Sequence, residues 1–189
     1  MSLDGEKSSM LNATGWSKFV LPLLMVLVGV MTRWLPHPPN MTAVMALGFV
    51  AGAVVPQRWL AILVPLVALL ISDLVLGFHG TMIYVYGATA LITILSLGLF
   101  SGKKNSVLAL GSWGFFSSGV FFVITNLGVW LQGGLYPLTK QGLIDSFVMA
   151  LPFYGNQLLG DLLYASLFFA AKAFYDRRVL ARSATFLQS

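Results

Sequence analysis

Two aspartates lie inside apolar stretches of the sequence, where an ionised side chain is costly to bury. Asp73 lies in the run at 59–77, and Asp161 lies in the run at 156–175. A carboxylate in hydrocarbon costs about 2.5 to 3.5 kcal/mol on insertion scales. Each aspartate therefore serves either a binding site or hydrogen bonds between helices, and the sequence leaves both alternatives open. Asp73 is the first functional candidate.

Other polar and aromatic residues are expected at the same end of the predicted helices as these aspartates. A few fixed polar groups among apolar walls are typical of a small-molecule site. Here Arg33 and the imidazoles would meet anionic or metal-bearing groups, the aspartates would accept hydrogen bonds, and the aromatic rings would stack on a flat substrate. The predicted ligand-binding residues are Arg33, His37, Asn40, Asp73, His79, Tyr84, Tyr86, Asn126, Trp130, Tyr136, Asn156 and Asp161.

The composition indicates a polytopic membrane protein. The chain of 189 residues is 58% hydrophobic and 9% charged, whereas soluble domains contain about 25% charged residues. Its mean hydropathy is +0.86. The chain is too short to contain a separate soluble catalytic domain in addition to its predicted spans. The absence of cysteine excludes disulfides and thiolate chemistry. The net charge of +5 reflects membrane topology and not binding to nucleic acid.

The hydrophobic pattern predicts an all-α membrane protein with six transmembrane helices. Residues 1–15 are expected to be a disordered tail, residues 16–176 a single transmembrane domain and residues 177–189 a cytoplasmic tail. The predicted spans are 19–31, 41–55, 59–77, 82–100, 107–131 and 156–175. Between the last two, residues 141–151 suit an amphipathic or re-entrant helix that Pro152 interrupts.

The prolines and small residues predict two local features. Three prolines in residues 35–40 exclude a helix and would hold His37 in a stiff loop, although they also serve simply to stop a helix. Gly48 and Gly52 form a small-xxx-small pair, which lets another helix approach closely. The small residues at 111–119 are also suited to close packing.

The basic residues predict the orientation. With six spans, nine of the 11 basic residues share the side of the termini, and Arg33 and Lys140 lie opposite. By the positive-inside rule both termini are cytoplasmic. The aspartates then lie on oppositely directed spans, in the similar segments LLISDLVLG and QLLGDLLYA. Such an echo is typical of the inverted repeats of transporters.

Residues from about 30 to 175 resemble a family of small bacterial membrane proteins. The motifs are RWLPHPPN (33–40), SDLVLGFH (72–79), YVYG (84–87), TNLGVWLQGGLYP (125–137) and LPFYGNQLLGDLLY (151–164). This family in turn resembles the S components of energy-coupling factor transporters, and most closely the solitary cobalamin-binding ones. The resemblance implies a six-helix bundle in the inner membrane of a bacterium that captures a vitamin or metal at the outer face.

The chain departs from that group in two respects. It lacks the cobalt-binding cysteine known in some members, so either His37 or His79 would replace the thiolate or no protein atom would touch cobalt. It also lacks the small-xxx-small motif on the first span that docks a coupling subunit. A corrinoid is the first substrate that the resemblance implies, with no separate cofactor.

The leading hypothesis is therefore a membrane transport protein that captures a vitamin-like molecule, alone or with a coupling subunit and its ATPases. The alternative is a structural accessory subunit of a larger membrane complex. An intramembrane enzyme is disfavoured, because neither aspartate lies in a recognisable catalytic motif.

Overall fold

The computed structural model describes residues 3–100 and 107–187, and the side chains of residues 19–100, 108–175 and 177. Within these ranges every regular element is a helix, which confirms the predicted all-α class. The elements are α1 (Leu3–Trp34), α2 (Val44–Val54), α3 (Arg58–Leu76), α4 (Met82–Phe100), α5 (Val107–Leu131), α6 (Lys140–Val148) and α7 (Leu151–Leu187). The basic turn predicted at 101–106 lies outside the described residues.

Four of the described helical segments are long and apolar enough to cross a membrane. They are Arg58–Leu76, Met82–Phe100, Leu108–Leu131 and Leu151–Tyr175. The other two predicted spans correspond to shorter apolar helical segments, Phe19–Trp34 and Val44–Val54. Large apolar side chains point outward, such as Val75 at 68% exposed and Ile83 at 74% exposed. An apolar surface of this kind suits lipid and not water.

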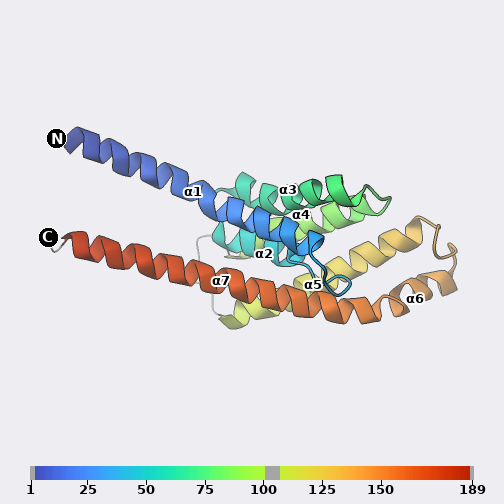
Figure 1. The fold of residues 1–189 in the computed structure, drawn as a ribbon. Coiled ribbons are helices and arrows are strands. Elements are labelled where there is room, and N and C mark those ends of the chain that lie inside the picture. The colour runs from blue at the N-terminus through green and yellow to red at the C-terminus, as the bar shows by residue number, and fades with distance from the viewer. Residues whose placement is uncertain (1–2, 101–106, 188–189) are drawn as a thin grey trace.

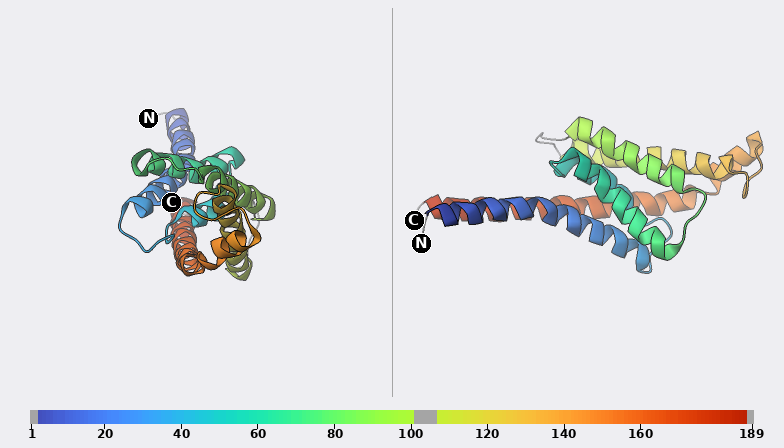
Figure 2. Two further views of the ribbon diagram at one scale, coloured as in Figure 1. Left: turned by 90° about the vertical axis from the view of Figure 1, so that its right-hand side faces the viewer. Right: turned by 90° about the horizontal axis from the view of Figure 1, so that it is seen from above.

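The short helix α2 forms the centre of the bundle. Its residues from Val44 to Gly52 are all buried, and it packs against α3, α4 and α7 (Figures 1 and 2). Phe49, at 2% exposed, is among the largest fully buried side chains. Because α2 is enclosed by other helices on every side, its side chains are apolar around the whole helix.

The turns on both sides of α2 and α3 follow from residue type. Residues 35–42 form an irregular loop, as the prolines predict, and Asn40 adopts a left-handed φ of 64° that an asparagine tolerates. Gly77, with φ 95°, ends α3. These two turns bring the end of α1 and the end of α3 to the same end of the bundle (Figure 1).

The predicted close approach at Gly48 and Gly52 occurs between α2 and α4. A Cβ atom added at Gly52 would lie 2.6 Å from Ser96 Cβ and 2.7 Å from the carbonyl oxygen of Thr93. At Gly48 the nearest atom, Thr93 Oγ1, would lie at 3.3 Å. The two glycines therefore set the distance between these helices.

Helix α5 is less closely packed than its small residues predict. Ser117 and Ser118 are buried, but a Cβ atom at Gly111 would meet nothing within 4 Å, and one at Gly114 would meet only the ring of Phe49. The expectation of close packing therefore holds for the buried residues Gly114, Ser117 and Ser118 and fails at Gly111.

The segment between α5 and α7 contains the predicted amphipathic helix. This helix, α6, comprises Lys140–Val148, whereas residues 141–151 were predicted. Thr139 caps α6, since its hydroxyl oxygen accepts a hydrogen bond from the Gly142 N–H at 3.1 Å. Pro152 lies in the first turn of α7, where its missing N–H costs nothing, and does not interrupt α6.

The first and last helices extend beyond their predicted ends. Helix α1 begins at Leu3, where a disordered tail was predicted for residues 1–15, and α7 continues to Leu187 through the predicted tail. No proline lies in residues 3–15, and neither proline nor glycine follows Gly160, so nothing stops either helix. Both chain ends lie at one end of the molecule (Figures 1 and 2).

We predict that Gly52→Ala lowers the free energy of unfolding by about 1 to 3 kcal/mol, because the added methyl group overpacks the α2–α4 contact. The measurement is the thermal unfolding midpoint in detergent. Gly98→Ala on α4 is the matched control, since its Cβ would meet nothing within 4 Å. Equal midpoints for the two variants would contradict the close crossing.

Candidate functional site

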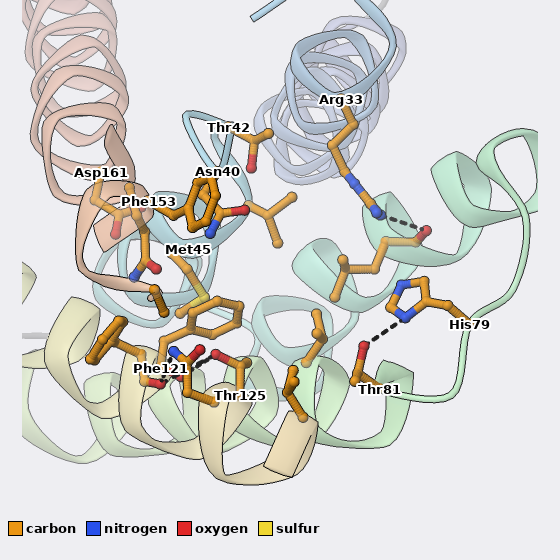
Figure 3. Close-up of a pocket in the computed structure, with 18 of the residues that line it drawn as sticks. Arg33, Asn40, Thr42, Met45, His79, Thr81, Phe121, Thr125, Phe153 and Asp161 are labelled. Carbon is orange, nitrogen blue, oxygen red and sulfur yellow. Dashed lines mark hydrogen bonds between the residues drawn. The ribbon is translucent and has the colours of Figure 1, made fainter. Parts of the chain in front are cut away.

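An open cavity of about 410 Å³ lies at the end of the bundle opposite the chain termini (Figure 3). Its floor is the amino end of α2, and its walls come from the ends of α1, α3, α4, α5 and α7. The residues that line it are Arg33, His37, Asn40, Thr42, Val44, Met45, Leu69, Leu76, His79, Thr81, Val85, Phe121, Phe122, Thr125, Asn126, Val129, Ala150, Phe153, Gln157 and Asp161.

The cavity exists because α2 is shorter than its neighbours. Eleven residues of helix span about 16 Å, against about 28 Å for the 19 residues of α3. The space beyond the amino end of α2 is therefore bounded by helices on its sides and by residues Val44 and Met45 below.

Half of the twelve predicted ligand-binding residues line this cavity. These residues are Arg33, His37, Asn40, His79, Asn126 and Asp161. They come from five different parts of the chain, and Figure 3 shows Arg33 and Asp161 on opposite sides of the space. The sequence thus correctly brings several polar groups together at one end of the bundle.

Asp73 does not line the cavity and lies behind Arg33, with which it forms an ion pair. Arg33 Nη2 lies 2.6 Å from Asp73 Oδ1, and the Tyr86 hydroxyl donates to Asp73 Oδ2 at 2.8 Å. Arg33 Nη1 also donates to Ser72 Oγ at 2.6 Å. Asp73 is 1% exposed. The network connects α1, α3 and α4. Of the two roles that the sequence left open for Asp73, the structure thus favours hydrogen bonds between helices.

Asp161 has a different environment, although it is equally buried at 1% exposed. The Ser118 hydroxyl donates to its Oδ2 atom at 2.5 Å, while its Oδ1 atom has no hydrogen-bond partner. The side-chain amide of Gln157 and the backbone N–H of Ala46, at the amino end of α2, lie nearby. The positive end of the α2 dipole favours an anion at this position.

The two histidines both line the cavity but are exposed. The Nδ1–H of His37 donates to the carbonyl oxygen of Leu35 at 2.7 Å, and Nδ1 of His79 pairs with Thr81 Oγ1 at 2.8 Å. Among the described residues, no group of three or more histidine, cysteine or acidic side chains is placed to hold a metal ion. A metal bound only to His37 and His79 would need further ligands from its own carrier molecule.

The predicted stacking residues lie outside the cavity. The ring of Tyr84 packs so closely on α5 that a Cβ atom at Gly128 would overlap it. Trp130 Nε1 donates to the carbonyl oxygen of Pro137 at 3.1 Å, in the loop that also holds Tyr136. Asn156 is next to a lining residue on α7 but does not line the cavity itself.

The aromatic wall consists instead of three phenylalanines that the sequence analysis did not select. Phe121 and Phe122 lie on α5, and Phe153 lies on α7. Four polar lining residues were also missed, Thr42, Thr81, Thr125 and Gln157. Helical spacing would have found several of them, since Phe122 lies four residues before Asn126 and Gln157 four residues before Asp161, on the same helix faces.

A second cavity of about 270 Å³ opens between α5 and α7 and is almost entirely apolar. It is lined by Phe49, Leu110, Gly111, Gly114, Leu162, Ala165, Ser166 and Phe169. It offers only the hydroxyl of Ser166 to orient a ligand. The first cavity, with its charged and amide groups, is therefore the candidate site.

The arrangement can bind a molecule but shows no catalytic constellation among the described side chains. Arg33 forms an ion pair with Asp73, and the hydroxyl of Ser118 donates its proton to the carboxylate of Asp161. The fold and the site together define an all-helical protein with an outer surface suited to a membrane and one polar cavity at the end of its bundle.

This chain belongs to DUF6580, a family of unknown function, whose model matches residues 14–184. No curated protein and no solved structure matches the chain.

We predict that Asp73→Asn lowers the free energy of unfolding by about 3 to 5 kcal/mol, because it leaves the partly buried Arg33 guanidinium without its counter-charge. Thermal unfolding in detergent measures this loss. Adding Arg33→Met to Asp73→Asn should recover part of it, since no unpaired charge then remains. His79→Ala, at an exposed site, is the control and should leave the midpoint unchanged. If Asp73→Asn unfolds at the wild-type temperature, the ion pair is not a structural link.

Proposed function

We propose that the protein is an integral membrane transport protein that captures a small molecule in the cavity between Arg33 and Asp161. The observation that carries this proposal is the cavity itself: it is open, about 410 Å³ in volume, and lined by the ends of five helices. Ligand sites commonly have about 300 to 1,000 Å³, apolar walls and a few fixed polar groups.

The proposed topology has six membrane crossings and cytoplasmic termini. The arrangement of the helices supports it, because the chain ends share the end of the molecule opposite the cavity (Figure 1). Arg58, the first residue of α3, also lies at the terminal end, whereas Arg33 lies at the cavity end. With the basic residues toward the cytoplasm, the cavity opens outward. Helix α2 then spans only the inner part of the bilayer, since about 16 Å is short of the 30 Å core.

The proposed ligand is smaller than a corrinoid. A space of about 410 Å³ lies toward the small end of the range of ligand sites, about 300 to 1,000 Å³, and the cavity offers a corrinoid no thiolate and no cluster of metal ligands in the described part of the chain. The likeness to S components of energy-coupling factor transporters thus supports capture of a substrate at the outer face more than it supports cobalamin as that substrate.

The orientation can be tested by cysteine labelling, because the chain has no native cysteine. We predict that Asn40→Cys reacts in intact cells with a membrane-impermeant maleimide, since residue 40 lies at the cavity mouth. Pro56→Cys, exposed at the opposite end of the bundle, is the matched control and should react only after the membrane is permeabilised. The reverse pattern would overturn the outward-open topology.

Ligand capture can be tested on protein gently purified in nanodiscs. We predict that mass spectrometry finds a small molecule that co-purifies with the wild-type chain and is lost in Thr125→Trp, because the indole fills the cavity. Ile83→Trp, at an outward-facing site that is 74% exposed, is the control and should retain the molecule. A chain that carries no molecule and is stable only together with other subunits would instead identify an accessory subunit of a membrane complex.

A further inference from the structure

The charges around the cavity do not balance. Arg33 and Asp73 form an ion pair with N–O distance 2.6 Å, so their charges cancel. Asp161, on the opposite side of the cavity (Figure 3), forms no ion pair with any described side chain. With neutral histidines and an ionised Asp161, the three groups Arg33, Asp73 and Asp161 together carry one uncompensated negative charge.

We infer that Asp161 anchors the ammonium group of the ligand, so that the substrate class is a small organic amine with an apolar body. This inference rests on the proposed function and names what the cavity selects. The carboxylate is 1% exposed, and its Oδ1 atom has no partner. A buried acceptor without a partner is costly, and an N–H donor from a ligand would remove that cost.

The other polar groups of the cavity favour a ligand that donates hydrogen bonds. Thr125 donates its hydroxyl proton to the carbonyl oxygen of Phe121 at 2.9 Å. Asn126 Nδ2 donates to Phe122 O at 2.7 Å, and Gln157 Nε2 donates to Ser118 O at 3.1 Å. Each of these groups uses one donor on a helix backbone, and the amide oxygens of Asn126 and Gln157 can only accept hydrogen bonds. Together with the unpartnered Oδ1 atom of Asp161, they can accept from the three donors of an ammonium group.

The walls near Asp161 suit both parts of an amine. Phe121 and Phe122 on α5 and Phe153 on α7 line the same space, and Figure 3 shows Phe153 beside Asp161. Aromatic rings attract a nearby cation and also cover the apolar body of a ligand. An anionic ligand would instead meet the charge of Asp161 with no free cation to offset it, because Arg33 is already paired.

The inference also separates the two aspartates. Asp73 has one donor on each carboxylate oxygen, from Arg33 and from Tyr86, and needs no ligand. On Asp161 the Oδ2 atom accepts from Ser118, and Oδ1 has no hydrogen-bond partner, although the Gln157 amide and the Ala46 N–H lie nearby. Of the two, only Asp161 lines the cavity.

Three probes of similar size and different charge test the inference: phenethylammonium, phenethyl alcohol and phenylacetate. Binding is measured at neutral pH by equilibrium dialysis of labelled probe against the full chain in nanodiscs, with empty nanodiscs subtracted. We expect phenethylammonium to bind about tenfold more tightly than either other probe. Asp161→Asn, which keeps the shape of the side chain, should remove that preference. Asp145→Asn on α6, outside the cavity, is the matched control and should retain it.

Two outcomes would overturn the inference. In one, the wild-type chain binds the alcohol or the carboxylate as tightly as the amine. In the other, Asp161→Asn keeps the preference for the amine. A third outcome would also overturn the inference. The wild-type chain would show no preference for the amine, and sodium chloride would raise its thermal unfolding midpoint but not that of Asp161→Asn. Asp161 would then bind an inorganic cation.

These failures differ from a failure of the proposed function. If the alcohol binds and Thr125→Trp prevents that binding, the cavity captures small molecules and only the amine assignment is wrong. If none of the three probes binds and no molecule co-purifies with the chain, both the amine assignment and the proposed capture are wrong.

Discussion

The burial of one short helix at the centre of the bundle is the constraint on which the structure depends. Helix α2 has 11 residues, and its residues from Val44 to Gly52 are all buried. Its contact with α4 is set by Gly52, where no side chain would fit. Since the neighbouring helices are longer, they extend beyond α2 at its amino end and enclose the cavity. The length of α2 thus determines both the core and the space for a ligand.

The amino end of α2 also explains how a carboxylate is accommodated at the base of this space. The residue before α2, Ala43, has no side chain that can cap the helix. Asp161 of α7 lies near the N–H of Ala46, and the close packing of Gly160 on Met41 brings it there, since a Cβ atom at Gly160 would lie 3.2 Å from Met41 Cα. A charge from another helix therefore faces the positive end of the α2 dipole.

Two aspartates in similar sequence surroundings have acquired different roles. Asp73 is bound on both oxygens and connects α1, α3 and α4, whereas Asp161 keeps one oxygen unpartnered beside the cavity. The difference arises from the helices opposite them. Helix α1 presents an arginine to Asp73, while α5 presents only the hydroxyl of Ser118 to Asp161. An ion pair supplies a full counter-charge, and a hydroxyl does not.

The local structure of this chain follows from its amino-acid sequence. The apolar runs predicted the helices, the prolines at 35–40 predicted the loop, and Gly48 with Gly52 predicted a close crossing, because these features depend on residues near one another in the chain. The sequence also placed Arg33, the histidines and Asp161 at one end of the bundle. It predicted the ends of α1 and α7 less well, because a helix continues where no residue stops it.

Which of these groups face the same space depends instead on how the helices pack together. This packing paired Arg33 with Asp73, turned Tyr84 and Trp130 away from the cavity, and placed Phe121, Phe122 and Phe153 around it. The physical reason is that the rotation of each helix about its axis is set by packing against its neighbours. The spacing of residues along one helix fixes which side chains share a face, but not which helix that face will meet.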